Sequence, residues 1–516
     1  MLFSSNIFIF LFLPVALLGY HVLGRFGRVP MFSWLSFVSL FFYGYWNPKY
    51  LFVLVGSIVL NFAASRLIVK MTGERAKSIV LVGSIAANIG LLVWFKYLFP
   101  LLGYFHGVGW LSRDFGNVVL PLGISFFTFT QIAYLVDLKQ EEAEPQDLLS
   151  YVLFVTFFPH LIAGPIIHHA EMMPQFTAQR HAGLRSDDMA VGTTWFLMGL
   201  GKKVLIADHF GPVADTLYSS PHSFGTQAAW VGACCYAIQL YFDFSGYSDM
   251  ALGLARMFSL TFPVNFNSPY KSSSIIEYWQ RFHMTLSRYL GLYLFNPIAM
   301  AMTRRRMQQG KMKGKKAKRT FGTYWQTVAY PILTTMFLAG IWHGAGMQFL
   351  VFGVMHGTYL ALNHAWRIFV PEQSPWQRLL PKPVSVAVTL LAVLVGDVMF
   401  RADSVRSALY VMGTMLGLHH GASLPNFVAH LPSHPSFATS ALQVWPQIAF
   451  VLAIALLLPN TQEILGQVED SERTRSLLFA RLRWTPNLLW GSAIIVMTSV
   501  ILVLMYASTS FLYFQF

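Results

Sequence analysis

Between Arg319 and Arg367 the sequence contains no Lys, Arg, Asp or Glu, and this run sets the strongest limit on the fold. A helix needs about 20 predominantly apolar residues to cross a bilayer, so the run is long enough for two crossings. The sequence therefore predicts a pair of membrane-spanning helices near residues 325–342 and 347–364.

Composition extends this conclusion to the whole chain. Hydrophobic residues make up 55% of the 516 residues and charged residues only 11%, with a mean hydropathy of +0.52. Soluble globular domains of this length do not have such a composition. We therefore predict an all-α polytopic integral membrane protein, with one membrane-embedded domain over residues 1–516. The further spans are expected near 6–23, 31–46, 50–69, 78–98, 117–136, 150–167, 190–207, 226–242, 384–400, 446–459 and 488–508.

One of these spans is interrupted. Residues 150–167 contain Pro159, Gly164 and Pro165, which favour a re-entrant element over a straight helix. Irregular backbone at bilayer depth is tolerated where protein buries it or where it lines a wet cavity. A simple Pro-kinked span is the alternative.

The net charge is +14, and part of it is concentrated in residues 304–319. This segment carries nine basic side chains and no acidic one, close to two apolar segments. The positive-inside rule predicts that it is a cytoplasmic loop. It could also hold an anionic donor. In a membrane protein a net positive charge indicates contact with anionic lipid headgroups. We therefore expect no nucleic acid partner.

His343 lies where the two spans of the uncharged run meet. An imidazole at bilayer depth is costly to desolvate, and polar residues kept there usually face a protein interior or a cavity. Gly340, Gly344 and Gly346 beside it would let a backbone or a ligand approach closely. The alternative is a packed histidine bonded to a neighbouring carbonyl. We interpret His356 and His364, on the next span, as structural packing or interface residues.

A polar part of the chain lies between the spans that end near 242 and begin near 325. Carboxylates this close to a membrane span need partners. Arg256 follows Asp249 by seven residues and Arg281 follows Glu277 by four, and both spacings suit ion pairs on one helix. These charges are expected to serve mainly as scaffold.

His283 lies in this polar part. Aromatic and aliphatic side chains recur around it at helical spacing, which predicts one amphipathic helix at the membrane interface. The stripe comprises Tyr278, Phe282, Leu286, Tyr289, Leu290 and Tyr293. His283 is expected at its margin, either facing a cavity or solvated.

Two such histidines in a membrane protein poor in buried charge suggest acyl or proton transfer. The sequence has no Gly-x-Ser-x-Gly elbow, and the adjacent Cys234 and Cys235 lie near no histidine in sequence. Direct transfer to a bound acceptor is therefore the simpler scheme. We expect no disulfide and no metal, because the histidines of residues 418–444 lack ordered ligand spacing. They are His419, His420, His430 and His434.

Several segments together resemble the membrane-bound O-acyltransferase family, and within it the bacterial alginate O-acetylase branch. The resemblance is carried by Trp342-His343-Gly344, by His283 in the context Trp279-x-Arg281-Phe282-His283, and by residues 1–6, 120–126, 158–166, 242–249 and 400–402. The sequence departs from that branch at Gly291-Leu292 and at residues 297–300, which bears on the acceptor and partner proteins rather than on the core chemistry.

The resemblance implies a helical fold with re-entrant and interfacial helices around a buried tunnel, in the bacterial cytoplasmic membrane. It implies acyl transfer, with acetyl-CoA as the donor, to an exported polysaccharide such as alginate or cellulose. A periplasmic acetyltransferase or another polysaccharide-modifying protein would be a partner. It also places the essential histidine at His343 and the second active-site histidine at His283; the residues that bind the donor are not indicated.

Two alternatives remain at this point. One is a D-alanyl transferase of the same family, acting on teichoic acid. The other is a transporter or lipid flippase, although such proteins commonly show repeated halves with matching broken helices, which we do not find in this sequence.

Overall fold

The computed structural model describes residues 1–108, 110–111, 119–177, 185–311, 320–370, 374, 381–431, 441–466, 482–505 and 512. The chain divides into two compact units. Unit 1 comprises Met1–Gly201, Gly246–Val264 and Thr485–Gln515, and unit 2 comprises Lys202–Ser245, Asn265–Trp484 and Phe516. The single membrane-embedded domain predicted from the sequence remains a prediction.

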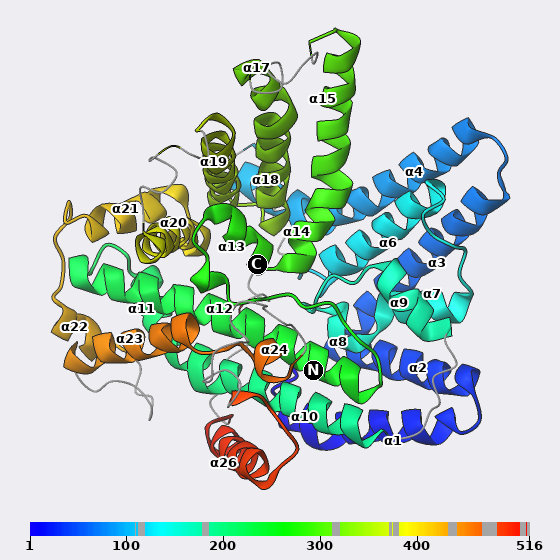
Figure 1. Cartoon of the computed structure of the whole chain (residues 1–516), viewed down its shortest axis with the longest axis horizontal. Coiled ribbons are helices and arrows are strands. Elements are labelled where there is room, and N and C mark those ends of the chain that lie inside the picture. Colours follow the sequence, from blue (N-terminus) through cyan, green and yellow to red (C-terminus); the bar gives the residue numbers. More distant parts are fainter. Residues whose placement is uncertain are drawn as a thin grey trace. The chain divides into compact units, whose positions relative to one another are not determined.

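The regular secondary structure of the described residues is helical, apart from one isolated bridge between Phe224 and Ala422 (Figure 1). This confirms the predicted all-α class. The elements of unit 1 are η1 (Phe8–Phe12), α1 (Leu13–Gly24), α2 (Arg28–Trp46), α3 (Pro48–Lys70), α4 (Glu74–Val93), η2 (Trp94–Leu98), α5 (Phe99–Gly107), α6 (Ile124–Lys139), α7 (Leu148–Thr156), α8 (Phe158–Leu161), α9 (His169–Thr177), α10 (Ser186–Gly201) and α26 (Leu488–Leu504).

Helix α12 (Thr226–Met257) contributes to both units. The other elements of unit 2 are η3 (Lys202–Ala207), α11 (Asp208–Ser219), η4 (Pro269–Lys271), α13 (Ile275–Arg281), α14 (Met284–Leu290), η5 (Gly291–Phe295), α15 (Asn296–Gln308), α17 (Phe321–Tyr324), η6 (Trp325–Ala329), α18 (Tyr330–His343), α19 (Met347–Phe369), α20 (Lys382–Arg401), α21 (Val405–Met415), α22 (Leu424–Ala429), α23 (Ala441–Leu457) and α24 (Thr461–Ile464).

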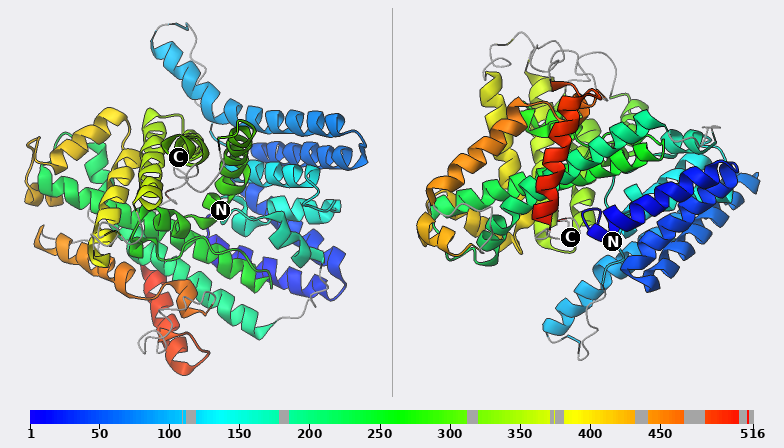
Figure 2. Two further views of the ribbon diagram at one scale, coloured as in Figure 1. Left: turned by 45° about the horizontal axis from the view of Figure 1, so that its top comes forward. Right: turned by 90° about the horizontal axis from the view of Figure 1, so that it is seen from below.

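Long apolar helices support the expected membrane protein. Among the described residues, Pro48–Lys70, Glu74–Gly107 and Lys382–Arg401 are long and apolar enough to cross a bilayer. Shorter apolar helices lie at Phe8–Gly24, Gln443–Leu457 and Leu488–Leu504. In both views of Figure 2 the blue helices of unit 1 run beside one another as a bundle.

The predicted interruption of residues 150–167 is confirmed. Helix α7 ends at Thr156, the short α8 begins with Pro159 in its first turn, and the backbone is not helical from there to α9. His160 on α8 is 2% exposed, and its Nε2 lies 3.0 Å from the carbonyl oxygen of Phe154. Protein therefore buries the irregular backbone, as membrane depth requires.

Two ion pairs in unit 1 join charged side chains at the ends of helices. Arg28 at the start of α2 lies 3.0 Å from Asp147, which precedes α7. Lys139 at the end of α6 lies 3.5 Å from Glu74 at the start of α4. Charges collected at helix ends leave the apolar middle of each helix free to face lipid.

In unit 2, helices α18 and α19 form a closely packed antiparallel pair. A Cβ atom at Gly340 would collide with the carbonyl oxygen of Phe349, and one at Gly353 with that of Met336. Small residues at such contacts are typical of helices that associate inside membranes. The glycines therefore serve the close approach of two backbones.

The basic segment 304–319 is a loop only in part, and this corrects the sequence analysis. Arg304 and Arg305 are exposed on the last turn of α15, whereas Arg306 is 7% exposed. The Arg306 guanidinium donates to the carbonyl oxygen of Gly322 at 3.1 Å and to Thr323 Oγ1 at 3.0 Å. These bonds tie α15 to α17, so one of the nine charges is structural. Residues 312–319 lie outside the described part of the chain.

Candidate active site

His343 is the last residue of α18. Gly344 follows in an extended conformation, which ends the helix and turns the chain toward α19. The imidazole is half-buried and packs against the rings of Trp342, Phe400 and Phe352, at centroid distances of 4.7, 5.0 and 6.0 Å. The site therefore holds a histidine that aromatic rings orient and that remains partly accessible.

His283 does not lie on a continuous amphipathic helix, contrary to the sequence analysis. Helix α13 ends at Arg281, Phe282 is extended, and His283 has φ +46° and ψ +53° before α14 begins. The side chain is 2% exposed, so His283 is not a solvated residue on a helix margin.

Backbone hydrogen bonds explain the break between α13 and α14. Met284 N–H donates to the Asn265 carbonyl, and Asn267 N–H donates to the Arg281 carbonyl, both at 2.9 Å. These groups bond to a distant segment instead of continuing one helix. A left-handed conformation is uncommon for a non-glycine residue and clusters at functional sites. The break turns His283 into the protein interior.

The hydrogen bonds of Asn265 fix the proton on His283. The Oδ1 atom of Asn265 accepts from the Thr285 amide at 3.3 Å and from the Thr285 hydroxyl at 2.8 Å. A backbone amide can only donate, so this atom is the oxygen of Asn265. His283 Nδ1 lies 3.0 Å from it and must therefore carry a hydrogen. In the neutral ring Nε2 is then the nitrogen with the lone pair.

Burial favours the neutral form of His283. Its position between α13 and α14 lies outside the apolar spans, and desolvation lowers its pKa to about 3. The buried Nε2 has no hydrogen-bond partner among the described residues. The ring thus presents a buried acceptor that could receive a hydrogen bond from a ligand.

A layer of aromatic rings runs from one histidine to the other within unit 2. Phe352 contacts His343 and, at 4.5 Å, His356, whose Nδ1 accepts from Trp279 Nε1 at 3.3 Å. Trp279 lies on α13 and is 6.5 Å from the ring of Phe282. Two further rings complete the layer: Phe266 lies 5.1 Å from Phe282, and Phe244 lies 4.8 Å from His283.

Helix packing agrees with this layer. Helix α13 packs against α19 and α20, and η5, which follows α14, packs against α18. The two candidate histidines therefore belong to one helical assembly, although they come from segments 60 residues apart, at positions 283 and 343.

The carboxylates of the polar segment pair differently from expectation. Glu277 and Arg281 form the predicted ion pair, at 3.0 Å. The predicted pairing of Asp249 with Arg256 is wrong. Both residues lie on α12, but their side chains contact residues of α10 instead of each other. Asp249 accepts from Trp195 Nε1 at 3.2 Å, and Arg256 lies 2.8 Å from Asp188.

Asp243 belongs to a buried charge cluster that the sequence analysis missed. Lys203 Nζ lies 2.7 Å from a carboxylate oxygen of Asp208 and 2.7 Å from one of Asp243. All three side chains are at most 6% exposed. These close, buried ion pairs join η3, α11 and α12, so Asp243 has a charged partner within the fold.

Asp397 on α20 is a second residue that the sequence analysis passed over. It is 4% exposed, and its Oδ2 has no hydrogen-bond partner among the described residues. A signal was present in the sequence, because a lone carboxylate in an apolar span is by default a candidate functional residue. The Nε2 of His356 lies close to the neighbouring Gly396. The interpretation of His356 as a packing or interface residue stays a prediction.

Within the segment 418–444, His419 and His430 have partners outside the candidate site. His419 stacks on Tyr410 at 4.2 Å, and His430 Nδ1 lies 2.6 Å from the Asn426 carbonyl oxygen. His434 lies outside the described residues. Cys234 and Cys235 are both free thiols.

With this geometry in place, sequence comparison defines the class of protein. The chain matches the model of the membrane-bound O-acyltransferase (MBOAT) family over residues 31–312, and it belongs to that family. The matched segment includes His283 and ends before His343. The predicted class of enzyme, an acyltransferase in a membrane, is thereby confirmed. The family match also argues against the alternative of a transporter or flippase.

Three relatives show which members of the family this chain is similar to. The chain is 38% identical to the peptidoglycan O-acetyltransferase of Helicobacter pylori, over 82% of this chain and 81% of that protein. It is 36% identical to the probable alginate O-acetylase AlgI of Pseudomonas putida, over 80% of each. The teichoic acid D-alanyltransferase of Streptococcus thermophilus is 25% identical, over 48% of this chain and 57% of that protein.

Proposed function

We propose that this enzyme transfers an acetyl group from a cytoplasmic thioester, acetyl-CoA, to a hydroxyl of an exported polysaccharide. The observation that carries the proposal is the sustained similarity to relatives named as O-acetyltransferases, over about four fifths of the chain. The D-alanyl transferase alternative is less favoured, because that similarity is weaker and covers about half of the chain. The two O-acetyltransferase names differ in their acceptor, so we assign the acceptor only as an exported glycan, with alginate or cellulose as examples.

The proposed reaction requires one proton acceptor. The acceptor hydroxyl oxygen attacks the thioester carbonyl carbon while His343 Nδ1 or Nε2 takes the hydroxyl proton. The tetrahedral intermediate then expels the thiolate as the carbon–sulfur bond breaks. His343 returns its proton to the thiolate, which gives the ester and the free thiol. The partial exposure of His343 supports its access to both substrates.

His283 has a different role in this proposal. Its neutral ring with a lone pair on Nε2 suits a group that accepts a hydrogen bond from the donor, such as an amide N–H near the thioester. A hydrogen-bond donor to the developing oxyanion would need a proton on Nε2, and the bond of Nδ1 to Asn265 disfavours that tautomer. We therefore assign His283 as a residue that positions the donor.

We also propose that the enzyme crosses the bacterial cytoplasmic membrane several times, and that a periplasmic acetyltransferase or another polysaccharide-modifying protein acts with it. Membrane lipids surround the apolar helices. In this arrangement the acyl group passes from the cytoplasmic side through the protein to the acceptor outside.

The orientation can be tested at the basic segment. Lys315→Cys, in a background with Cys234→Ala and Cys235→Ala, should resist a membrane-impermeant maleimide in intact cells and react after permeabilisation, because so many uncompensated basic side chains are costly to translocate. Labelling in intact cells, at the level reached after permeabilisation, would place the segment outside and reverse the proposed side of donor entry.

The donor can be tested in membrane vesicles that contain the protein. Radiolabelled acetyl-CoA should transfer its label to the exported glycan, and a D-alanyl thioester on a carrier protein should not. Transfer of D-alanine without transfer of acetyl would overturn the assignment in favour of the D-alanyl alternative.

A further inference from the structure

Three side chains outside the candidate active site converge in unit 1. His168 Nε2 and His169 Nε2 lie 3.1 and 2.7 Å from the same oxygen, Oδ2 of Asp137. One ligand atom from each residue lies within 4.8 Å of the others. Two imidazoles and a carboxylate are a donor set that borderline divalent metals such as Zn²⁺ prefer.

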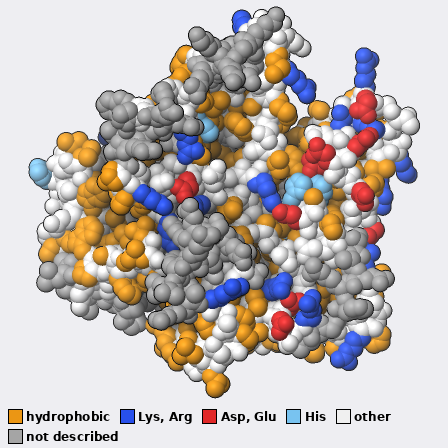
Figure 3. All heavy atoms as spheres, in the orientation of Figure 1, with side chains coloured by type: hydrophobic (Ala, Val, Ile, Leu, Met, Phe, Trp, Pro, Cys, Tyr) orange, Lys and Arg blue, Asp and Glu red, His pale blue; other side chains and the backbone are white. Residues whose placement is uncertain are grey.

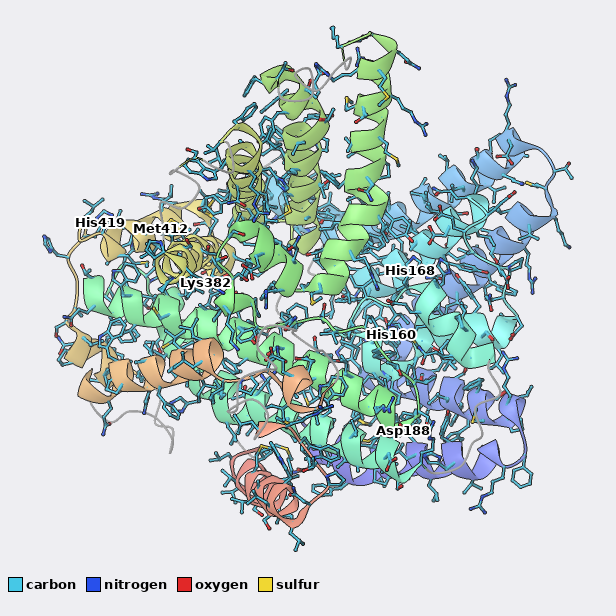
Figure 4. All side chains as sticks on the ribbon, in the orientation of Figure 1. His160, His168, Asp188, Lys382, Met412 and His419 are labelled. Carbon is cyan, nitrogen blue, oxygen red and sulfur yellow. The ribbon has the colours of Figure 1, made fainter. Side chains whose placement is uncertain are left out.

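The fold brings these residues together from separate elements. Asp137 lies in the last turn of α6, and His169 is the first residue of α9. Between them the chain runs through α7, α8 and the non-helical segment that leads to α9. Helix α7 packs against both α6 and α9, which returns the two histidines to the carboxylate. Figure 4 labels His168 beside α6.

Burial differs within the cluster in a way that suits a metal site. The side chains of Asp137 and His169 are each 6% exposed, whereas that of His168 is 22% exposed. In the same orientation as Figure 4, Figure 3 shows histidine atoms at the surface in this place, with acidic and basic side chains beside them. An ion could therefore enter past His168 and be held by two buried ligands. Zinc sites with three protein ligands commonly take a water as the fourth ligand.

We propose that Asp137, His168 and His169 bind a divalent transition-metal ion of the zinc class. Tetrahedral coordination at about 2.0 to 2.2 Å places ligand atoms about 3.4 Å apart. The nitrogen–oxygen distances of 3.1 Å for His168 and 2.7 Å for His169 must therefore widen by about 0.3 and about 0.7 Å to admit the ion. Side-chain rotation suffices for a change of this size.

Metal binding also changes the tautomer of His168. Its Nδ1 accepts a long hydrogen bond, 3.3 Å, from the amide of Ala170. Coordination through Nε2 moves the ring hydrogen to Nδ1, so this contact is given up and Nδ1 becomes a donor. Two hydrogen bonds of His168, from the Ala170 amide and to Asp137, are exchanged for a metal–nitrogen bond.

The bound ion would join the end of α6 to the start of α9 and so fix the broken segment between them. It takes no part in the proposed acyl transfer, and the proposal stands on the geometry of unit 1 alone. It departs from the expectation of no metal, which rested on histidine spacing in the sequence.

The first test uses the wild-type protein, purified in detergent with an affinity tag that contains no histidine. After treatment with a chelator, the protein is titrated with Zn²⁺, and with Co²⁺ as a spectroscopic probe. We expect one ion per chain, d–d absorption bands typical of mixed nitrogen and oxygen ligands, and a rise of a few degrees in melting temperature with Zn²⁺. No saturable binding by wild type would overturn the proposal and leave the cluster as a hydrogen-bonded scaffold.

Variants locate the ion. His168→Ala and Asp137→Asn should each remove both the Co²⁺ bands and the Zn²⁺-dependent rise in melting temperature. The matched control is His106→Ala, an exposed histidine on α5 outside the cluster, which should bind like wild type. Should Asp137→Asn fail to fold, His168→Ala decides the matter, because it removes the most exposed ligand. Unchanged metal binding by a folded His168→Ala would place the ion elsewhere and contradict the proposal.

Discussion

His343→Ala is expected to abolish measurable acetyl transfer while the protein remains inserted in the membrane at normal abundance. The imidazole is the proposed acceptor of the hydroxyl proton, and loss of a general base typically lowers the rate by about 10² to 10⁴. The ring is only half-buried at the carboxyl end of α18, so its removal leaves the close contact between Gly340 and α19 intact. Acetylation of the polymer, normalised to the amount of protein in the membrane, measures the effect.

A histidine in the same apolar hairpin serves as the control for this prediction. His364 on α19 is half-buried like His343, and the proposed reaction does not use it. His364→Ala should acetylate at close to the wild-type rate. Normal acetylation by His343→Ala at normal abundance would remove His343 from the mechanism.

His283→Ala is expected to lower transfer by about 10², the loss typical of a misplaced substrate. His283→Gln should lose less than about tenfold, since the amide oxygen of Gln can still accept a hydrogen bond worth about 1 kcal/mol. Gln has no basic nitrogen and cannot carry a proton, so the pair of variants separates hydrogen bonding from proton transfer. Initial rates of transfer at varied acetyl-CoA concentration, in vesicles, provide the measurement.

Two other outcomes would change the role of His283. If His283→Gln is as inactive as His283→Ala, His283 transfers a proton in the reaction. Its assignment as a positioning residue is then wrong. If both variants match wild type, the buried acceptor is structural and the site reduces to His343. Asn265→Ala provides a further check, because it removes the acceptor that fixes the tautomer and should weaken transfer without removing the ring.

The sequence predicted the features that depend on local composition. Charge-free runs predicted the α-helical membrane class and, among the described residues, three helices long and apolar enough to cross a bilayer, because bilayer thickness fixes their length. The predicted pair of spans near 325–342 and 347–364 stays a prediction. Pro159 gave the break between α7 and α9, because proline removes a backbone donor. Both predictions depend only on residues that lie within about 20 positions of one another in the sequence.

Features that depend on distant contacts could not be predicted in this way. The aromatic stripe from Tyr278 to Tyr293 keeps its helical period across the break at His283. The cause of the break is a backbone pairing with Asn265 and Asn267, which no period in the sequence reveals. For the same reason Arg256 pairs with Asp188 rather than with Asp249, a residue on its own helix.

The central claim is that this protein acetylates an exported glycan through His343. The most direct test is mass spectrometry of the exopolysaccharide and the peptidoglycan, both purified from cells that lack the gene, complemented with wild type or with His343→Ala. We predict that wild type restores a mass increase of one acetyl group on a fraction of the sugar residues and that His343→Ala does not. An acetylation pattern that is identical in the deletion strain and in both complemented strains would contradict the claim.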